Sequence, residues 1–491
     1  MKIWQEKRFP VILVLLNIVL TLFIFDPRLY LGGDNITFII LGQSLLDGQG
    51  YRDLSQPDTP VYIGSPPGYP VFLMLLMLIF GGGANAIHFK LASLGLSCVS
   101  LFFFYRILQT FNLGQAFSFI TALLVVVNFN ILYPNHLELS DVLFNVFLMA
   151  SLYFFMSKHK YGISLGVLLA VLATYTRYAG IVLIFALLAY LLLKKRFKQF
   201  WVYGGLALVL ILPWALFVIA HGFGLTDILT GTPYAAERKL ITLADLGQRW
   251  FENFKHYFLN LIPMDLFTWL QPPIWGGIIA TAVILLGLYF KIRAKFSALE
   301  LYFIFYIMLI LSWPQVWSGE RYILPIIYFM AIYFCYALFR LIKSKIFLAA
   351  IGLLVLYNAS VIVRLIPLTY HRFQAQLQGK IARYYPAEWL GFFQCCNWIS
   401  KNLPEQAIVV SRKPNMLYYQ TGNRGFVYPF SQNHDQVYQK VLKSDYILVD
   451  QFEWTTSTRQ YLLPALYEHE QNFQLIYRVP EKNFFILKVK K

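Results

Sequence analysis

Residues 25–51 read FDPRLYLGGDNITFIILGQSLLDGQGY, and they join the first long apolar run of the chain to a second apolar segment. The first run, residues 10–25, ends here, and the segment NITFIILGQSLL begins a few residues later. Between them a Gly-Gly pair is followed by one carboxylate, that of Asp34. An acid in this position either caps the next helix or acts as a functional group at a membrane boundary. The rest of the chain shows whether a membrane is involved.

The composition of the chain is that of a membrane protein. Of its residues, 58% are hydrophobic and only 13% are charged, whereas soluble domains carry about 25% charged residues. The apolar residues occur in blocks of membrane-spanning length, about 20 residues. The net charge of +17 comes from short Lys and Arg clusters between these blocks, where such clusters set membrane topology. We therefore predict a polytopic α-helical membrane protein and exclude nucleic acid as a partner.

Eleven apolar runs are predicted to span the membrane: residues 10–25, 86–105, 115–133, 141–157, 161–175, 178–193, 200–220, 274–290, 298–313, 323–340 and 346–363. A twelfth run, residues 69–80, is too short to span comfortably. If it does not cross, five later basic clusters lie on the same side as the basic N-terminus: Arg106, Lys158 with Lys160, and residues 194–198, 291–295 and 340–345. Because Lys and Arg favour the cytoplasmic side, the sequence predicts a cytoplasmic N-terminus and places residues 69–80 at the outer face.

Three outer regions are long enough to form structure. Residues 26–85 and 221–273 are loops of a transmembrane domain at residues 1–363, and residues 364–491 form a tail of ordinary composition. The second loop holds the amphipathic stretch LADLGQRWFENFKHYFLNLI. The tail holds a helix-like stretch, WLGFFQCCNWISKNL, and four strand-like runs, AIVVS, YILVD, FQLIYRV and FFILKV. This pattern predicts a small extracytoplasmic α/β domain.

Acidic residues gather on the predicted outer side, where 13 of the 15 Asp and Glu residues before residue 364 fall. His136, Glu138 and Asp141 share one outer turn, in YPNHLELSDVLFNVFL. A carboxylate in the first turn of a span also interacts favourably with the helix dipole. This effect explains an acid at Asp141, but it does not explain three titratable groups in one turn. Partial desolvation at a membrane boundary makes a carboxylate a stronger base. We therefore predict Asp34, Glu138 and Asp141 as the catalytic acids.

Two arginines are predicted at the same boundary. Arg177 lies beside Tyr178 in the tight turn of ATYTRYAGIVLI, where it either binds a phosphate or forms an ion pair with one of the acids just named. Glu320 and Arg321 precede a late span, in WPQVWSGERYILP, among aromatic residues typical of a membrane interface. We predict all four of these residues as substrate-binding residues.

The stretch VYIGSPPGYPVFLMLLMLIFGG, residues 61–82, contains a proline-initiated apolar helix. This helix serves as an interfacial anchor, as a wall that faces the substrate, or as both. Tyr62, just before the helix, is predicted as a further substrate-binding residue. The chain has no metal-type spacing of Cys and His and no glycine-rich phosphate loop. We therefore predict no metal site and no cofactor, and a divalent metal stays open as an alternative that the sequence does not indicate.

In the order and spacing of these features, the chain resembles the GT-C class of integral-membrane glycosyltransferases. It is most similar to the branch that holds the protein O-mannosyltransferases and the lipid A aminoarabinose transferase. An acid follows the first span, a proline-initiated helix comes late in the first outer loop, an acid opens the fourth span, and an Arg-Tyr pair precedes a late span. The resemblance covers residues 1–360 and maps the family's catalytic base onto Asp34. The chain departs from many relatives at Asn35 and Ser65, where they have a second acid and a His.

The tail has no Asn-x-Ser/Thr glycosylation sequon, so the simplest location is the inner (cytoplasmic) membrane of a bacterium. The resemblance implies an inverting glycosyltransferase. Such an enzyme moves one sugar from a polyprenyl-phosphate donor to a lipid, glycan or protein acceptor at the outer face. Two alternatives stay open: a flippase or transporter of lipid-linked sugars, and a polysaccharide polymerase or ligase. A transporter favours charges at the centres of spans, and the predicted span centres are nearly free of them.

Overall fold

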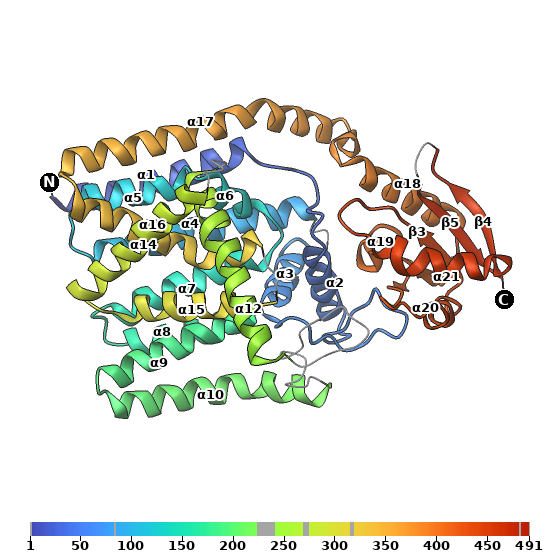
Figure 1. The fold of residues 1–491 in the computed structure, drawn as a ribbon, viewed down its shortest axis with the longest axis horizontal. Helices are drawn as coiled ribbons and strands as arrows, with labels where there is room; N and C mark the ends of the chain where they lie inside the picture. Colours follow the sequence, from blue (N-terminus) through green and yellow to red (C-terminus); the bar gives the residue numbers. More distant parts are fainter. Residues whose placement is uncertain are drawn as a thin grey trace.

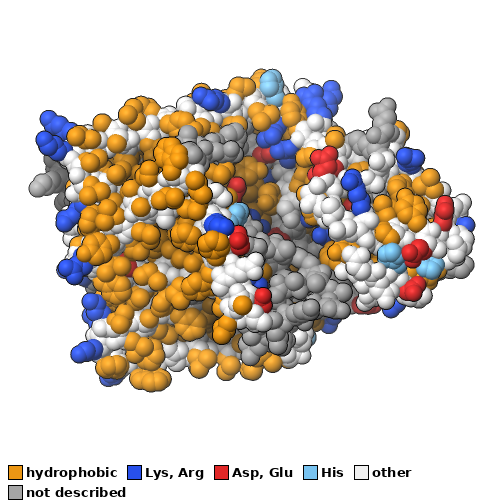
Figure 2. All heavy atoms as spheres, in the orientation of Figure 1, with side chains coloured by type: hydrophobic (Ala, Val, Ile, Leu, Met, Phe, Trp, Pro, Cys, Tyr) orange, Lys and Arg blue, Asp and Glu red, His pale blue; other side chains and the backbone are white. Residues whose placement is uncertain are grey.

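A computed structural model describes residues 2–82, 85–222, 241–268, 274–314, 319–480 and 483–490. Figure 1 shows long helices lying roughly side by side in a bundle, with a smaller domain that contains a sheet beyond one end of it. Lys and Arg gather at the other end of the bundle (Figure 2), where the N-terminus also lies. This distribution agrees with the predicted topology, because basic residues favour the cytoplasmic side.

Each of the eleven predicted runs contains a helix. These helices are α1 (Lys2–Phe23), α4 (Ala86–Gln109), α5 (Gln115–Val126), α7 (Ser140–Met156), α8 (Gly162–Thr176), α9 (Ile181–Leu193), α10 (Phe197–Ala220), α14 (Ile274–Ala294), α15 (Ala298–Ser312), α16 (Leu324–Leu341) and α17 (Ser344–Leu377). Within the described residues, five are long and apolar enough to cross a membrane: α4, α10, α14, α16 and α17. A sixth span is possible if α5 and the segment Phe129–His136, which meet at a bend of 71°, count as one. The other five predicted runs form shorter apolar helices, so their crossing remains a prediction.

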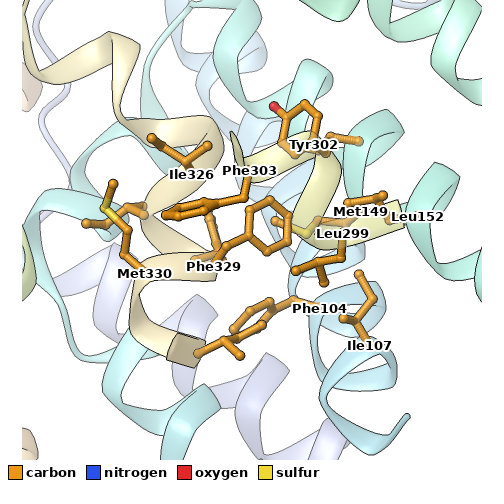
Figure 3. Close-up of a cluster of buried hydrophobic side chains, with 14 of the residues drawn as sticks. Phe104, Ile107, Met149, Leu152, Leu299, Tyr302, Phe303, Ile326, Phe329 and Met330 are labelled. Carbon is orange, nitrogen blue, oxygen red and sulfur yellow. The ribbon is translucent and has the colours of Figure 1, made fainter. Parts of the chain in front are cut away.

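Helix α16 lies at the centre of the bundle. Every residue from Leu324 to Ala337 is buried, as expected for a helix that is apolar on all sides. Figure 3 shows its Phe329 packed among side chains of α4, α7 and α15, such as Phe104 and Phe303. On another side α14 approaches closely, because a Cβ added at Gly287 would meet the carbonyl oxygen of Tyr333 at 1.9 Å. The core is therefore built from helices far apart in the sequence.

Short helices cover the end of the bundle that faces the smaller domain. In the first loop, α2 (Asp34–Leu46) packs against α3 (Gly68–Ile79). Helix α3 has only 12 residues and leaves large apolar side chains exposed, such as Leu75 and Leu78. This structure agrees with the expectation that residues 69–80 form an apolar helix too short to span. Its place along the outer face remains a prediction.

The second loop is helical where the structure describes it. It contains α12 (Leu243–Phe254), the π-helical segment η3 (Lys255–Leu261) and α13 (Ile262–Phe267), so the amphipathic stretch noted in the sequence is helical. Asn253 fixes α12 against the end of α15, because its side-chain Nδ2 donates to the carbonyls of Ile310, Leu311 and Trp313 at 3.1, 2.9 and 2.8 Å. Residues 223–240 and 269–273 of this predicted loop lie outside the described residues.

The smaller domain, from α18 to β5, is called the tail domain below. Its elements are α18 (Ala387–Asn402), β1 (Val409–Val410), α19 (Pro414–Thr421), β2 (Gly425–Phe426), α20 (His434–Val441), β3 (Tyr446–Val449), α21 (Leu463–Glu468), β4 (Phe473–Arg478) and β5 (Phe485–Val489). The sheet has the order β2-β1-β3-β5-β4, in which β2, β1 and β3 are parallel and β3, β5 and β4 are antiparallel. The predicted helix and all four predicted strands are confirmed, and β2 was not predicted.

Helix α17 connects the bundle to the tail domain. It runs without interruption across residues 363 and 364, where the sequence placed the domain boundary. The remaining short elements are α6 (Phe129–Leu132), η1 (Tyr133–His136), η2 (Tyr178–Gly180), η5 (Glu320–Tyr322), η6 (Ile381–Tyr384), η7 (Thr458–Leu462) and η8 (Glu470–Asn472).

The tail domain shares a hydrophobic core with the first loop. One buried cluster contains Ile36 and Leu73 from the loop helices together with Phe392 and Leu417 from the tail domain. Polar contacts extend this interface. Asn415 Nδ2 donates to Thr37 Oγ1 at 2.6 Å, and the backbone N–H of Gly425, in β2, donates to the carbonyl of Ser55 at 2.8 Å. The first loop is therefore held between the bundle and the tail domain.

Candidate active site

Four chain connections at this end of the bundle bring the predicted site residues together. They are the segment from α1 to α2, the segment from η1 to α7, the turn after α8, and η5 before α16. Asp34 lies where the first connection enters α2, and Asp141 lies where the second enters α7. Arg177 lies in the turn after α8, and Arg321 lies in η5. Within the described residues, these four residues form one connected set of ion pairs.

Asp34 begins α2 but does not cap it. The N-cap position is Gly33, and no side chain makes a capping hydrogen bond there. The Asp34 carboxylate instead pairs with Arg321, with 2.7 Å between Oδ2 and Nη1. Its side chain is 58% exposed, so the group is held in place and still reachable from solution. The helix-cap alternative from the sequence is therefore wrong.

Asp141 is the buried centre of the site. It lies in the first turn of α7, as predicted, and only 1% of its side chain is exposed. Its Oδ1 pairs with Arg177, while its Oδ2 accepts from Arg321 Nη2 at 3.1 Å and from Nε at 3.3 Å. Arg177 therefore forms an ion pair with Asp141, one of the acids named for it from the sequence, and its binding of a phosphate remains a prediction.

Arg321 links the two acids, because Nε and Nη2 on one edge of its guanidinium donate to Asp141 while Nη1 donates to Asp34. Burial acts to lower the pKa of Arg321, but the Asp141 and Asp34 carboxylates outweigh it and the pKa is raised. Arg177 also lies over the Tyr322 ring, with 5.8 Å between its Cζ and the ring centroid. Both guanidinium groups are therefore fixed in orientation.

Glu138 lies in a separate buried pair. Its carboxylate is 3.3 Å from Lys90 Nζ in α4, and both side chains are 0% exposed. Lys90 also donates to the backbone carbonyl of His136 at 3.2 Å. Burial raises the pKa of Glu138 even though Lys90 acts in the opposite direction. The Lys90–Glu138 pair holds the turn before α7 in place, and Asp141 follows Glu138 by three residues, in the first turn of that helix.

Replacing Lys90 by methionine is expected to destabilise the protein in a pH-dependent way. Without Lys90, the buried Glu138 favours its protonated form still more strongly, so its folded pKa lies further above the ordinary value of 4.5. When a group has a higher pKa in the folded than in the unfolded state, it leaves the free energy of unfolding unchanged below the unfolded pKa. As pH rises above that value, the free energy of unfolding falls. The loss of melting temperature should therefore be small near pH 4.5 and several degrees near pH 7. A loss that is equal at both pH values would contradict this account.

The other predicted substrate-binding residues lie around the ion pairs. Tyr178 OH donates to the carbonyl of Ile63 at 2.8 Å, which ties the turn after α8 to the first loop. Burial raises the pKa of the neighbouring Tyr62, and the negative charge of Asp34 adds to the effect. Glu320 is exposed, and within the described residues Arg321 forms its ion pairs with Asp34 and Asp141 instead. Trp317, one of the aromatic residues near Arg321 in the sequence, lies outside the described residues.

Sequence reasoning missed two residues near Asp34. Tyr30 lies close enough for Arg321 to lower its pKa, although burial raises the pKa overall. Lys413 of the tail domain approaches the first loop so closely that a Cβ added at Gly33 would be 3.1 Å from its Nζ. Gly33 has a φ of 99°, a conformation suited to glycine. The Gly-Gly pair before Asp34 was the only sequence signal for a close approach here, and it did not identify the partner.

Replacing Gly68 by alanine is expected to disturb the site through packing. A Cβ at this first residue of α3 would meet the carbonyl oxygen of Tyr175 at 2.5 Å, close to the turn that carries Arg177. Overpacking of this kind costs about 1–3 kcal/mol, so both melting temperature and transfer activity should fall. Gly95→Ala in α4 is the matched control, because nothing lies within 4 Å of its added Cβ. Equal melting temperatures and equal transfer activities of the two variants would contradict the prediction.

No group of three or more His, Cys, Asp and Glu residues in the described parts of the chain could hold a metal ion. A cavity of about 270 Å³ lies at the other end of the bundle, lined by residues such as Asn112, Arg196 and Lys295. It is remote from the ion pairs, because it is formed by the connections on the opposite side of the helices.

Comparisons with known proteins point to one class. Residues 64–217 match the family model described as dolichyl-phosphate-mannose-protein mannosyltransferase. This segment contains Asp141 and Arg177 but neither Asp34 nor Arg321. No curated protein matches the chain. The crystal structure of ArnT from Cupriavidus metallidurans matches with a TM-score of 0.58 at 14% sequence identity, over 97% of this chain and 97% of that one. The resemblance expected from the sequence is therefore confirmed: the chain has the GT-C fold of ArnT and carries, over residues 64–217, the sequence pattern of the mannosyltransferase family.

Proposed function

We propose that this protein is an inverting glycosyltransferase of the bacterial cytoplasmic membrane. It transfers one monosaccharide from a polyprenyl-phosphate donor to a hydroxyl or amine of a lipid, glycan or protein acceptor at the outer face. The observation that carries the proposal is the arrangement of Asp34, Arg321, Asp141 and Arg177, in which one exposed acid stands beside two oriented guanidinium groups. A base next to phosphate-binding donors is what a displacement at a sugar phosphate requires.

In the proposed reaction, the acceptor oxygen or nitrogen attacks the anomeric carbon of the sugar. The new bond forms as the bond from that carbon to the phosphate oxygen breaks, so the configuration inverts. Asp34 accepts the proton that the acceptor loses, and the polyprenyl phosphate leaves with the bonding electrons. Arg177 and Arg321 stabilise the negative charge on the departing phosphate, because guanidinium groups bind phosphate with two parallel N–H donors.

The shared use of Arg321 couples donor binding to the base. Arg321 Nη1 binds Asp34 at 2.7 Å, so a phosphate that accepts from this nitrogen competes with Asp34 for it. Donor binding then weakens the hold on the Asp34 carboxylate at the moment when a base is needed. Asp141, which is buried and bound to both arginines, holds Arg177 and Arg321 in position during the reaction.

The remaining predicted residues are assigned supporting roles. Asp141 is the second acid of the site, since it shares Arg321 with Asp34. Glu138 positions the turn before Asp141 through Lys90. Tyr62, Tyr178 and Glu320 border the site and shape the space for the sugar and the acceptor, together with the tail domain and the second loop.

The proposal is tested in a deletion strain complemented with the wild-type gene. Lipid-linked sugars and surface glycans are analysed by mass spectrometry. The expected result is that one glycan lacks a single sugar in the deletion strain while the matching monosaccharide donor accumulates, and that the wild-type gene restores both. A change only in the membrane side on which the donor is found would support a flippase instead. Loss of whole polysaccharide chains would support a polymerase or ligase.

A further inference from the structure

The tail domain places two cations at the first loop. Arg412 and Lys413 form the connection between β1 and α19, and α19 packs against α2. Figure 1 shows α2 between the bundle and the tail domain. Lys413 Nζ is the nearest heavy atom to a Cβ added at Gly33, at 3.1 Å, and Gly33 directly precedes Asp34. Arg321 thus reaches Asp34 from the bundle, while Lys413 approaches from the tail domain.

Aromatic rings hold both cations in place. Lys413 Nζ lies 4.7 Å from the ring centroid of Trp454, and Arg412 Cζ lies 5.2 Å from the same ring. Arg412 also lies 4.8 Å from the Phe430 ring, and its Nε donates to Ser457 Oγ at 3.0 Å. Because both groups share one indole ring, two positive charges are fixed next to each other.

Neither cation forms an ion pair with a carboxylate in the part of the chain that the structure describes. Asp34 pairs with Arg321, and the buried Asp450 accepts from Thr458 Oγ1 at 2.8 Å. Burial, together with the charge of Arg412, lowers the pKa of Lys413 to about 8, although Asp34 and Asp450 act in the opposite direction. The repulsion from Arg412 acts more strongly on Lys413 than the attraction of either carboxylate. An anion bound between them relieves this repulsion.

We propose that Arg412 and Lys413 form an anion-binding position beside Asp34, and that it takes a phosphate or carboxylate group of the acceptor. The proposal rests on the proposed function, since it is Asp34 as base that makes its neighbour an acceptor position. The donor phosphate is already assigned to Arg177 and Arg321, which belong to the bundle. The anionic group bound at the tail domain therefore belongs to the second substrate. Its binding orients the nucleophile toward Asp34.

The test uses the full-length protein in detergent micelles and inorganic phosphate as the probe, at constant ionic strength. Binding at this position is followed through Trp454 fluorescence, defined as the phosphate-dependent signal that is missing in Trp454→Phe. Lys413→Met should raise the Kd for phosphate about tenfold or more, the usual effect of losing one charged hydrogen bond. Lys440→Met is the matched control, because Lys440 also lies over an aromatic ring of the tail domain, that of Phe426 at 4.7 Å. Its Kd should stay within about twofold of wild type.

A second variant, together with melting temperatures, distinguishes a loss of binding from a loss of folding. Melting temperatures are recorded for all variants, and Arg412→Gln removes the other charge while leaving Lys413 beside Gly33. It should weaken phosphate binding to a similar degree. Equal affinity of the wild type, Lys413→Met and Arg412→Gln for phosphate would overturn the anion position. Acetate, titrated in parallel, tells a carboxylate preference from a phosphate preference.

Failure of this inference is distinguishable from failure of the proposed function. The phosphate titration involves no transfer reaction, so it reports on Arg412 and Lys413 whether or not Asp34 is a base. Full transfer by Asp34→Asn would overturn the proposed function and, with it, the acceptor role. Unchanged phosphate affinity in both tail variants would overturn the anion position alone.

Discussion

Replacing Asp34 by asparagine abolishes glycosyl transfer, with an expected loss of about 10²–10⁴-fold, the usual contribution of a general base. Asparagine has nearly the same shape but cannot accept the acceptor proton. The fold should persist, because the side chain is 58% exposed and Arg321 keeps its two hydrogen bonds to Asp141. The measurement is the complementation assay above, in which Asp34→Asn should restore neither the glycan nor the donor pool.

The matched control for this prediction is Asp47→Asn. Asp47 follows the same helix α2 at its other end, where it accepts a hydrogen bond from Gln43 at 2.7 Å. It is an acid of the same loop that forms no ion pair with the described residues of the site, so its amide variant should complement fully. If Asp34→Asn also restored the glycan, Asp34 would serve only as an ion-pair partner of Arg321, and the transporter alternative would gain ground.

Replacing Asp141 by asparagine is expected to remove both activity and stability. Asp141 is the common partner of Arg177 and Arg321, and 1% of its side chain is exposed. Removing its charge leaves two guanidinium groups beside a neutral amide, and breaking a buried pair in this way costs about 3–5 kcal/mol. The arginines then also lose the orientation that phosphate binding requires. The measurements are the thermal midpoint of the purified protein and glycan transfer in the complemented strain.

An exposed ion pair provides the control for Asp141. Glu252 lies 3.7 Å from Lys255, and both side chains are more than 40% exposed, at 42% and 47%. Exposed pairs contribute about 0–1 kcal/mol, so Glu252→Gln should leave the thermal midpoint nearly unchanged. A midpoint for Asp141→Asn equal to that of Glu252→Gln would show that the arginines find other partners, and it would remove Asp141 from the centre of the site.

Much of the fold was predictable because membrane helices are encoded locally. Each apolar run from residues 10–25 to residues 346–363 contains a helix, since a run of this kind needs no distant partner to satisfy its backbone. The same local reasoning identified the strands of the tail, whose apolar runs are short and bounded by polar residues. It missed β2, because two residues, Gly425 and Phe426, give no alternating pattern.

The site was predictable in its members but not in its pairings. Acids and arginines at the ends of apolar runs are unusual enough to attract attention, which is how Asp34, Asp141 and Arg321 were found. Their pairings depend on which connections meet in space, so Glu138 could not be separated from Asp141 in advance. Lys413 gave no signal at all, since it lies in a tail of ordinary composition and more than 370 residues after Asp34.

The hydrophobic core shared by the first loop and the tail domain sets an order on the biosynthesis of this protein. Ile36 and Leu73 are translated more than 300 residues before their packing partners Phe392 and Leu417. Until the tail has been translated and has reached the same side of the membrane, the apolar faces of α2 and α3 stay uncovered. Premature termination after α17 should therefore yield chains that quality-control proteases recognise by this loop, far from the site of truncation.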